Sequence, residues 1–183
     1  MRQIDELKKF SESINGKIIF DYDLKKTNWL NIGGVAKGFF KPENLKEIVE
    51  FLKRFGEKEK IFILGAGSNI LVNDNFFDGI VIKLGKNFSN ISLLSNDTLV
   101  AGSATNDKKL AEFAAKNNIA GFEFLSCIPG TIGGGIRMNS GCFKKEFKDI
   151  LISIQFIDYK GIIKSIPANK IKFNYRYIEL PKD

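Results

Sequence analysis

The sequence predicts an α+β fold built as two small lobes, and three observations support this class. Short apolar runs typical of strands alternate with segments of helical periodicity along the 183 residues. Glycine-rich stretches at 65–69 and 128–141 separate these segments. No tandem repeat or low-complexity linker interrupts the pattern. We therefore expect a first lobe over residues 1–88 and a second over residues 89–183, joined near residues 86–92.

The first lobe is expected to pack a helix against a small sheet. Residues 1–26 predict a polar helix followed by an extended segment. Residues 42–56 place apolar side chains at helical spacing, with Pro42 suited to the first turn and Gly56 to the end of the helix. Strands are expected at 61–64, 70–72 and 80–84.

The second lobe is expected to contain one longer helix and a hairpin. Residues 98–101 predict a strand, and residues 106–118 predict a helix that Asn106 caps. Alternating apolar residues in 151–158, followed by a turn and the apolar run 161–166, predict a β-hairpin.

The composition predicts a soluble, cytoplasmic protein with a real core. Hydrophobic residues make up 44% of the chain. No stretch approaches the roughly 20 consecutive apolar residues of a membrane span. The first ten residues contain acidic and basic side chains without an apolar segment, which is not the pattern of a secretory signal. We therefore expect no membrane partner.

The residue types exclude several kinds of site. The chain has no histidine, so His-dependent triads and His-ligated metals are excluded, and its two cysteines, Cys127 and Cys142, lack metal-site spacing. The formal net charge is +7, which suits phosphorylated small molecules as well as nucleic acids. The lysines are scattered and not striped, so nucleic-acid binding is the weaker alternative and we expect no nucleic-acid partner.

The first glycine segment, GAGSNILVND at 65–74, directly follows a predicted strand. Gly65 and Gly67 allow unusual backbone conformations and close approach of a ligand, while successive N–H groups can hold an anion. Ser68 and Asn69 add side-chain donors. The apolar run 70–72 stands where a Rossmann turn needs its third glycine, and no P-loop string occurs in the chain. The alternative is a glycine-rich turn with only a structural role.

The second glycine segment is IPGTIGGGIRMNSG, at 128–141. Pro129 and Gly130 predict a bend, and Thr131 can cap the helix that follows. The glycines at 133–135 each disfavour a helix by about 1 kcal/mol relative to alanine. They are explained if a flat or anionic ligand contacts the backbone; close helix packing or a mobile loop is the alternative.

Four strings in this order resemble the UDP-N-acetylenolpyruvoylglucosamine reductases of peptidoglycan synthesis. Residues 28–42 resemble the opening strand of the family, 65–74 its first flavin loop, and 121–143 its second. Residues 173–177, FNYRY, resemble the segment that contains the active-site arginine. The match runs through most of the chain, from residue 28 to residue 177, and 121–143 is the most specific string.

The resemblance implies a two-lobed FAD-binding domain of the vanillyl-alcohol oxidase, or PCMH, type. It implies non-covalent FAD between the lobes with its pyrophosphate on the glycine segments, NADPH as reductant, and a UDP-sugar as substrate. The cofactor-binding residues that it assigns are Gly65, Ala66, Gly67, Ser68, Asn69, Pro129, Gly130, Thr131, Gly133, Gly134, Asn139 and Gly141.

The resemblance also assigns a catalytic and substrate-binding role to Arg176 and a substrate contact to Tyr175. A guanidinium is always charged and holds both oxygens of a carboxylate, where hydride addition to an enolpyruvyl group develops negative charge. Taken without its neighbours, Arg176 would be an ordinary surface arginine. No metal is implied.

Two departures from the family pattern concern single residues, and a third concerns the end of the chain. Gly135 and Cys142 stand where the family often has alanine. The family continues with a substrate domain that contains a serine proton donor and a late glutamate, and nothing after Asp183 supplies them. We therefore expect little or no turnover by this chain alone. A separate chain that supplies the substrate domain and a non-catalytic flavin- or nucleotide-binding module are the alternatives.

Overall fold

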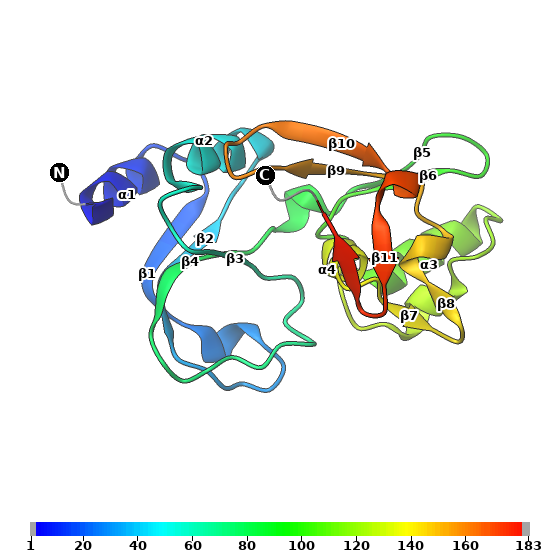
Figure 1. The fold of residues 1–183 in the computed structure, drawn as a ribbon, viewed down its shortest axis with the longest axis horizontal. Coiled ribbons are helices and arrows are strands. Elements are labelled where there is room, and N and C mark those ends of the chain that lie inside the picture. The colour runs from blue at the N-terminus through cyan, green and yellow to red at the C-terminus, as the bar shows by residue number, and fades with distance from the viewer. Residues whose placement is uncertain (1–2, 181–183) are drawn as a thin grey trace. The chain divides into compact units, whose positions relative to one another are not determined.

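The computed structural model describes residues 3–180 and divides the chain into two compact units (Figure 1). The first unit comprises Met1–Leu64, Ile70–Gly85 and Ile157–Ile163. The second comprises Gly65–Asn69, Lys86–Phe156 and Lys164–Asp183. The first glycine loop therefore belongs to the second unit, although its neighbours on both sides belong to the first. A domain boundary between residues 88 and 89 remains a prediction, because compactness alone does not define a folding domain.

The first unit is built on a four-stranded sheet with the order β1-β2-β4-β3. Strand β1 runs antiparallel to β2, whereas β2, β4 and β3 are parallel to their neighbours. The elements are α1 (Gln3–Glu12), β1 (Lys17–Asp23), a 3-10 turn (Leu24–Thr27), β2 (Val35–Lys41), α2 (Leu45–Phe55), β3 (Ile61–Ile63) and β4 (Phe77–Ile82).

Helix α2 begins where a side chain can satisfy its first N–H groups. The side-chain oxygen Oδ1 of Asn44 accepts the N–H of Glu47 at 3.1 Å. The buried Glu47 carboxylate in turn accepts the backbone N–H groups of Asn15, Gly16 and Glu43. Pro42 lies before this cap, so the prediction of Pro42 in the first turn is wrong. The predicted end is confirmed, because Gly56 is the C-terminal cap.

Neighbouring phenylalanines of β2 face opposite sides of the sheet. Phe39 and Phe40 are both fully buried, as the alternation of a strand allows. The Phe40 ring packs against Phe10 of α1 and Phe51 of α2, with ring centroids 6.2 and 4.9 Å away. Helices α1 and α2 therefore cover this face.

The opposite face is covered by loops. Phe39 belongs to a cluster with Leu24, Leu64 and Val81, against which Ile70 packs. The predicted strand at 70–72 is wrong, because this stretch forms no strand. Its apolar side chains are explained instead by packing from a loop onto the sheet.

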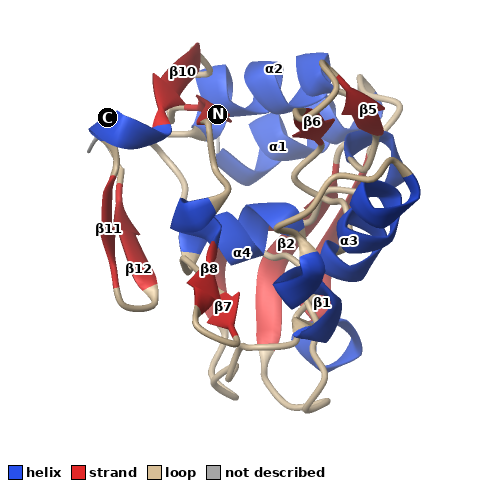
Figure 2. Ribbon diagram, turned by 90° about the vertical axis from the view of Figure 1, so that its right-hand side faces the viewer, coloured by secondary structure: helices blue, strands red, loops and turns tan. Residues whose placement is uncertain are grey.

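The second unit contains helices α3 and α4 and several two-stranded ladders (Figure 2). Its elements are β5 (Ile91–Leu93), β6 (Leu99–Ala101), α3 (Asp107–Lys116), a 3-10 turn (Glu123–Cys127), α4 (Ile132–Arg137), β7 (Gly141–Cys142), β8 (Lys145–Glu146), β11 (Lys172–Asn174) and β12 (Tyr177–Glu179). Strands β9 (Ser153–Ile157) and β10 (Ile163–Pro167) pair, which confirms the predicted hairpin.

Helix α3 follows its prediction closely. The Asn106 side chain accepts the N–H of Lys109 at 3.3 Å, which confirms the predicted cap. Leu110 on its inner face packs with Phe124 and with Ile132 of α4. This core fixes the start of α4, and with it the second glycine segment.

Candidate functional site

The two glycine segments meet within the second unit. The Ser68 hydroxyl donates a hydrogen bond to the carbonyl oxygen of Pro129. A Cβ atom placed on Gly65 would lie 2.8 Å from the Thr131 hydroxyl oxygen. Two segments separated by about 60 residues in sequence thus form one backbone surface, as required if they bind one ligand.

The first loop presents unsatisfied backbone donors. Gly67 has a φ of 73°, in the left-handed region that favours glycine. None of the N–H groups of residues 65–69 donates to another residue in the part of the chain that the structure describes. Successive N–H groups without protein acceptors are the donors that an anion such as a phosphate requires.

The three consecutive glycines of α4 have different surroundings. A Cβ atom on Gly133 would lie 3.0 Å from the Cβ of Ser103, and one on Gly135 would overlap the Phe147 ring. Close packing therefore explains these two. A Cβ atom on Gly134 would meet only the Thr131 hydroxyl, at 3.5 Å, which is an ordinary contact. The N–H of Gly134 also lacks a protein acceptor among residues 3–180, so packing does not explain this glycine.

A buried carboxyl group lies directly behind the second segment. A Cβ atom on Gly130 would lie 2.5 Å from Oδ2 of Asp107, so this position has no room for a side chain. Asp107 is fully buried, and neither of its oxygens has a partner among the described residues. Burial raises the pKa of Asp107 to about 7. The buried hydroxyl oxygen of Thr105 is also without a partner there.

The side-chain amide of Asn139 is used by contacts within the protein. Its side chain is fully buried and its φ is 39°. The amide nitrogen donates to Glu146 at 2.9 Å and to the carbonyl oxygen of Asn174 at 3.1 Å. The amide oxygen accepts the N–H of Lys148 at 3.1 Å. These protein contacts occupy both donors of the amide, and the cofactor-binding role of Asn139 stays a prediction.

Arg176 lies in the two-residue turn between β11 and β12, beside Tyr175. Its Nη2 atom donates to the carbonyl oxygen of Gly141 at 3.1 Å, so the structure brings the predicted arginine to the end of the second glycine segment. The guanidinium lies over the Tyr175 ring, 5.3 Å from its centroid. Tyr175 is 82% exposed, so both side chains are accessible from solvent.

Arg137 was not singled out from the sequence, yet it contacts the same hairpin. Its Nη1 atom donates to the carbonyl oxygen of Ile178 at 3.1 Å, and its guanidinium lies 5.0 Å from the centroid of the Tyr177 ring. The sequence signal that could have indicated Arg137 was its position at the end of a glycine-rich helix, two residues before Asn139 and four before Gly141.

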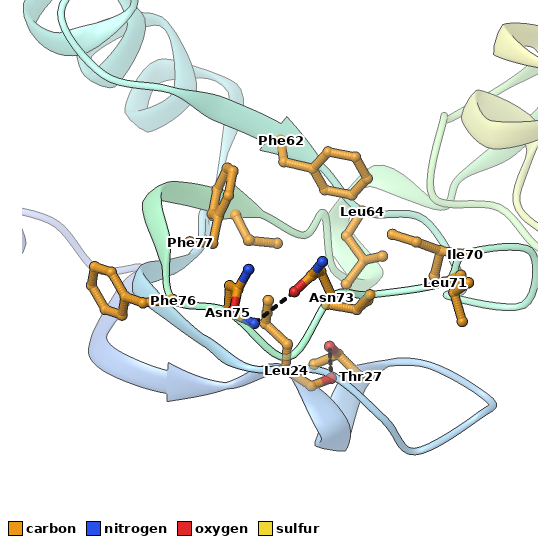
Figure 3. Close-up of a pocket in the computed structure, with 12 residues that line it drawn as sticks. Leu24, Thr27, Phe62, Leu64, Ile70, Leu71, Asn73, Asn75, Phe76 and Phe77 are labelled. Atoms are coloured by element: carbon orange, nitrogen blue, oxygen red, sulfur yellow. Dashed lines mark hydrogen bonds between the residues drawn. The ribbon is translucent and has the colours of Figure 1, made fainter.

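The first unit contains an apolar cavity of about 250 Å³ that the sequence did not predict. Figure 3 shows it between the 3-10 turn after β1 and the loop that leads into β4. Its polar groups include Asn73, whose side chain accepts the N–H of Asn75 at 2.8 Å. The cavity is lined by Leu24, Thr27, Phe62, Leu64, Ile70, Leu71, Val72, Asn73, Asn75, Phe76, Phe77 and Val81.

Among residues 3–180, no group of three or more His, Cys, Asp or Glu side chains is placed to hold a metal ion. No helix in this range is long and apolar enough to cross a membrane.

A family described as "FAD binding domain" matches residues 36–166, which include both glycine segments. The chain belongs to this FAD-binding family. The match confirms FAD as the cofactor expected of the domain.

Two relatives support the family resemblance that the four strings indicate. The chain is 64% identical to the UDP-N-acetylenolpyruvoylglucosamine reductase of Pelagibacter ubique over 98% of its own length and 60% of the relative's. It is 45% identical to the reductase of Rickettsia bellii over 93% of its own length and 56% of the relative's. The resemblance to the N-terminal part of these reductases is confirmed. The chain spans somewhat over half the length of these relatives.

Solved structures confirm the predicted fold class. The reductase of Thermus caldophilus aligns with a TM-score of 0.74 at 28% identity, over 92% of this chain and 58% of the other. The 6-hydroxy-D-nicotine oxidase of Arthrobacter nicotinovorans aligns with a TM-score of 0.63 at 14% identity, over 86% and 37%. The latter likeness shows the fold alone. The chain has the α+β, two-lobed FAD-binding fold of the vanillyl-alcohol oxidase type.

Proposed function

We propose that this chain holds FAD non-covalently on the paired glycine segments of its second unit, as the flavin-binding part of a UDP-N-acetylenolpyruvoylglucosamine reductase. The reaction is the NADPH-dependent reduction of an enolpyruvyl UDP-sugar to UDP-N-acetylmuramate, a step of peptidoglycan synthesis. The meeting of the two segments through Ser68 and Pro129 is the observation that supports this proposal most directly.

The residues present fit a dinucleotide pyrophosphate. The free N–H groups of residues 65–69 and of Gly134 offer donors, and Gly134 leaves the backbone open. Each hydrogen bond to a charged phosphate contributes roughly 1.5–3 kcal/mol. We assign the pyrophosphate contacts to Gly65, Ala66, Gly67, Ser68, Asn69 and Gly134. Pro129, Gly130, Thr131 and Gly133 would shape the cofactor surface beside them, because Pro129 has no N–H and the N–H of Gly133 donates to the carbonyl oxygen of Ser103.

Bound FAD would supply the hydride that NADPH provides, and the chain's own residues would orient the substrate. The Arg176 guanidinium, held by the Gly141 carbonyl oxygen and the Tyr175 ring, would bind the substrate carboxylate through its remaining N–H groups. Its fixed positive charge would favour the negative charge that develops beside the reacting carbon. The exposed Tyr175 would border the same carboxylate.

Flavin titration of the purified chain tests this proposal. Added FAD should lose fluorescence as it binds, whereas riboflavin, which lacks the pyrophosphate, should bind much more weakly. Equal binding of the two would contradict the role of the glycine segments, and absence of any FAD binding would overturn the proposal.

A second assay separates a reductase from a simple flavin holder. Oxidation of NADPH is followed with and without the UDP-enolpyruvyl sugar. Turnover that depends on the sugar supports reductase chemistry. FAD binding without reduction of the bound flavin by NADPH would support a non-catalytic flavin module instead.

A further inference from the structure

Alternate residues, beginning with the last residue of α4, contact the β11–β12 hairpin. Arg137 donates to the carbonyl oxygen of Ile178, Asn139 donates to that of Asn174, and the carbonyl oxygen of Gly141 accepts from Arg176. The three contacts thus come from every second residue of one short stretch.

Two of these contacts involve the turn that contains Arg176: one is made by Asn174 just before the turn and one by Arg176 itself. The bond from Asn139 to Asn174 and the bond from Arg176 to Gly141 are each 3.1 Å long. Asn174 is two residues before Arg176, and Gly141 is two residues after Asn139. The two bonds therefore close a small ring of backbone and side chains in which the Arg176 guanidinium has a defined position.

The Asn139 amide is suited to such a role because it is buried and fully used. Its donors bind Glu146 and Asn174, and its oxygen accepts from the N–H of Lys148. A buried amide with all these partners specifies one arrangement of the groups around it, since any shift leaves a buried polar group unpaired. The φ of 39° is one that asparagine tolerates better than most residues do.

Arg137 supports the same arrangement from the other strand of the hairpin. Its guanidinium packs on the Tyr177 ring and binds the carbonyl oxygen of Ile178, which is itself almost fully buried. Strand β12, which follows Arg176 directly, is thereby anchored to the last turn of α4.

We propose that Asn139 is a positioning residue that fixes the Arg176 guanidinium relative to the second glycine segment. This inference rests on the proposed function of Arg176. It adds that Asn139 connects the second glycine segment to the guanidinium that binds the substrate. Asn139 acts through the hairpin, whereas a direct cofactor ligand would need free polar atoms on its side chain.

The test compares Asn139→Gly with Asn118→Gly in the full chain. Glycine accepts a positive φ at both positions, so neither change strains the backbone. Asn118 has a φ of 58°, is exposed, and makes no side-chain hydrogen bond within residues 3–180, which makes it a matched control. The readout is the hydrogen-exchange rate of the Arg176 guanidinium N–H groups, measured by NMR, which the bond to Gly141 should slow.

Asn139→Gly should speed exchange of the Arg176 guanidinium N–H by about five- to tenfold, the factor expected when one neutral hydrogen bond no longer forms. Asn118→Gly should leave it unchanged. A folded Asn139→Gly protein with wild-type exchange at Arg176 would overturn the proposal, because a merely structural residue would lower the melting temperature without changing that signal.

Asn139→Asp provides a second variant of the same size in case the glycine variant does not fold. It keeps the acceptor for Lys148 and loses both amide donors, so Arg176 exchange should again be fast. Protonation of the new carboxyl at lower pH restores one donor, and the exchange rate relative to the wild type at the same pH should fall with it. Exchange at the wild-type rate throughout would count against the proposal. FAD titration of the unmodified chain separately tests the proposed function, so the two failures are distinguishable.

Discussion

Ser68 and Pro129 join the two glycine segments of the second unit, because the Ser68 hydroxyl donates to the Pro129 carbonyl oxygen. Neither residue belongs to a helix or a strand. The bond sets the distance between two stretches of backbone whose free N–H groups would otherwise move independently. Pre-arranged donors lower the ordering cost when an anion binds. The affinity for a dinucleotide should therefore depend on this bond more than the stability of the fold does.

Ser68→Ala should weaken FAD binding by about three- to tenfold, the range for loss of one hydrogen bond. The melting temperature should change little because Ser68 lies near the surface. The measurement is the dissociation constant from flavin fluorescence. Ser126→Ala is a matched control, since Ser126 also donates to a carbonyl oxygen, that of Glu123 at 2.7 Å, just before the second segment. An equal effect of both substitutions would show that the bond to Pro129 has no special role.

Gly134 and Gly135 should respond differently to alanine. Alanine at 135 would overlap the Phe147 ring and should lower the free energy of unfolding by about 1–3 kcal/mol. Alanine at 134 has room and favours a helix by about 1 kcal/mol, so stability should be kept or raised while FAD binds less well. Urea denaturation and FAD titration of both variants measure these effects. Unchanged FAD affinity in Gly134→Ala would remove this glycine from the cofactor surface.

These two glycines also show what the sequence could predict. Three glycines in a helix indicated that something approaches the backbone closely, and this is correct. The sequence could not tell a ligand from a neighbouring side chain, because Phe147 and Ser103 contact the helix only through the tertiary fold. The alternative of close packing thus explains two positions and leaves Gly134 for a ligand.

Local signals predicted the helices better than the strands. Asn106 and Gly56 were identified correctly because capping depends on the nearest few residues. The apolar run 70–72 was predicted as a strand, since an apolar run looks the same whether it pairs with a strand or packs from a loop. The position of Arg176 beside Gly141 had no local signal, and the family resemblance predicted only a role for this arginine at the substrate carboxylate.

Asp107 should make the stability of the protein depend on pH. Its pKa is about 7 in the folded protein against an ordinary value of 3.8, so the folded state binds more protons than the unfolded state between these values. Stability should therefore fall as the pH rises from about 4 to about 7 and level off above that. Unfolding free energies from urea titrations across this range measure the slope.

Asp107→Asn should flatten this dependence and stabilise the protein at neutral and higher pH, because a neutral amide avoids a buried charge. The same change should make FAD affinity less sensitive to pH, since an ionised carboxylate behind Gly130 would repel a bound pyrophosphate. If stability and FAD affinity depended on pH in the variant as they do in the wild type, another group would control that dependence.

Arg176 offers the sharpest test of the proposed chemistry. Arg176→Ala should leave FAD affinity within about twofold, since the guanidinium contacts the Gly141 carbonyl oxygen and not the free N–H groups of the glycine segments. In a preparation that performs the reaction, oxidation of the reduced flavin by the UDP-enolpyruvyl sugar should slow by about a hundredfold or more, while reduction by NADPH is unchanged.

Arg176→Lys should recover only part of this loss, because an ammonium keeps the charge but cannot hold both carboxylate oxygens in one plane. Arg54→Ala is the matched control, since Arg54 is a half-exposed arginine of α2 that pairs with Glu50 at 3.4 Å in the first unit. Stopped-flow measurement of the two half-reactions separates the effects. If Arg176→Ala slowed both half-reactions equally, the arginine would act on the flavin site as a whole, and its assignment to the substrate carboxylate would be wrong.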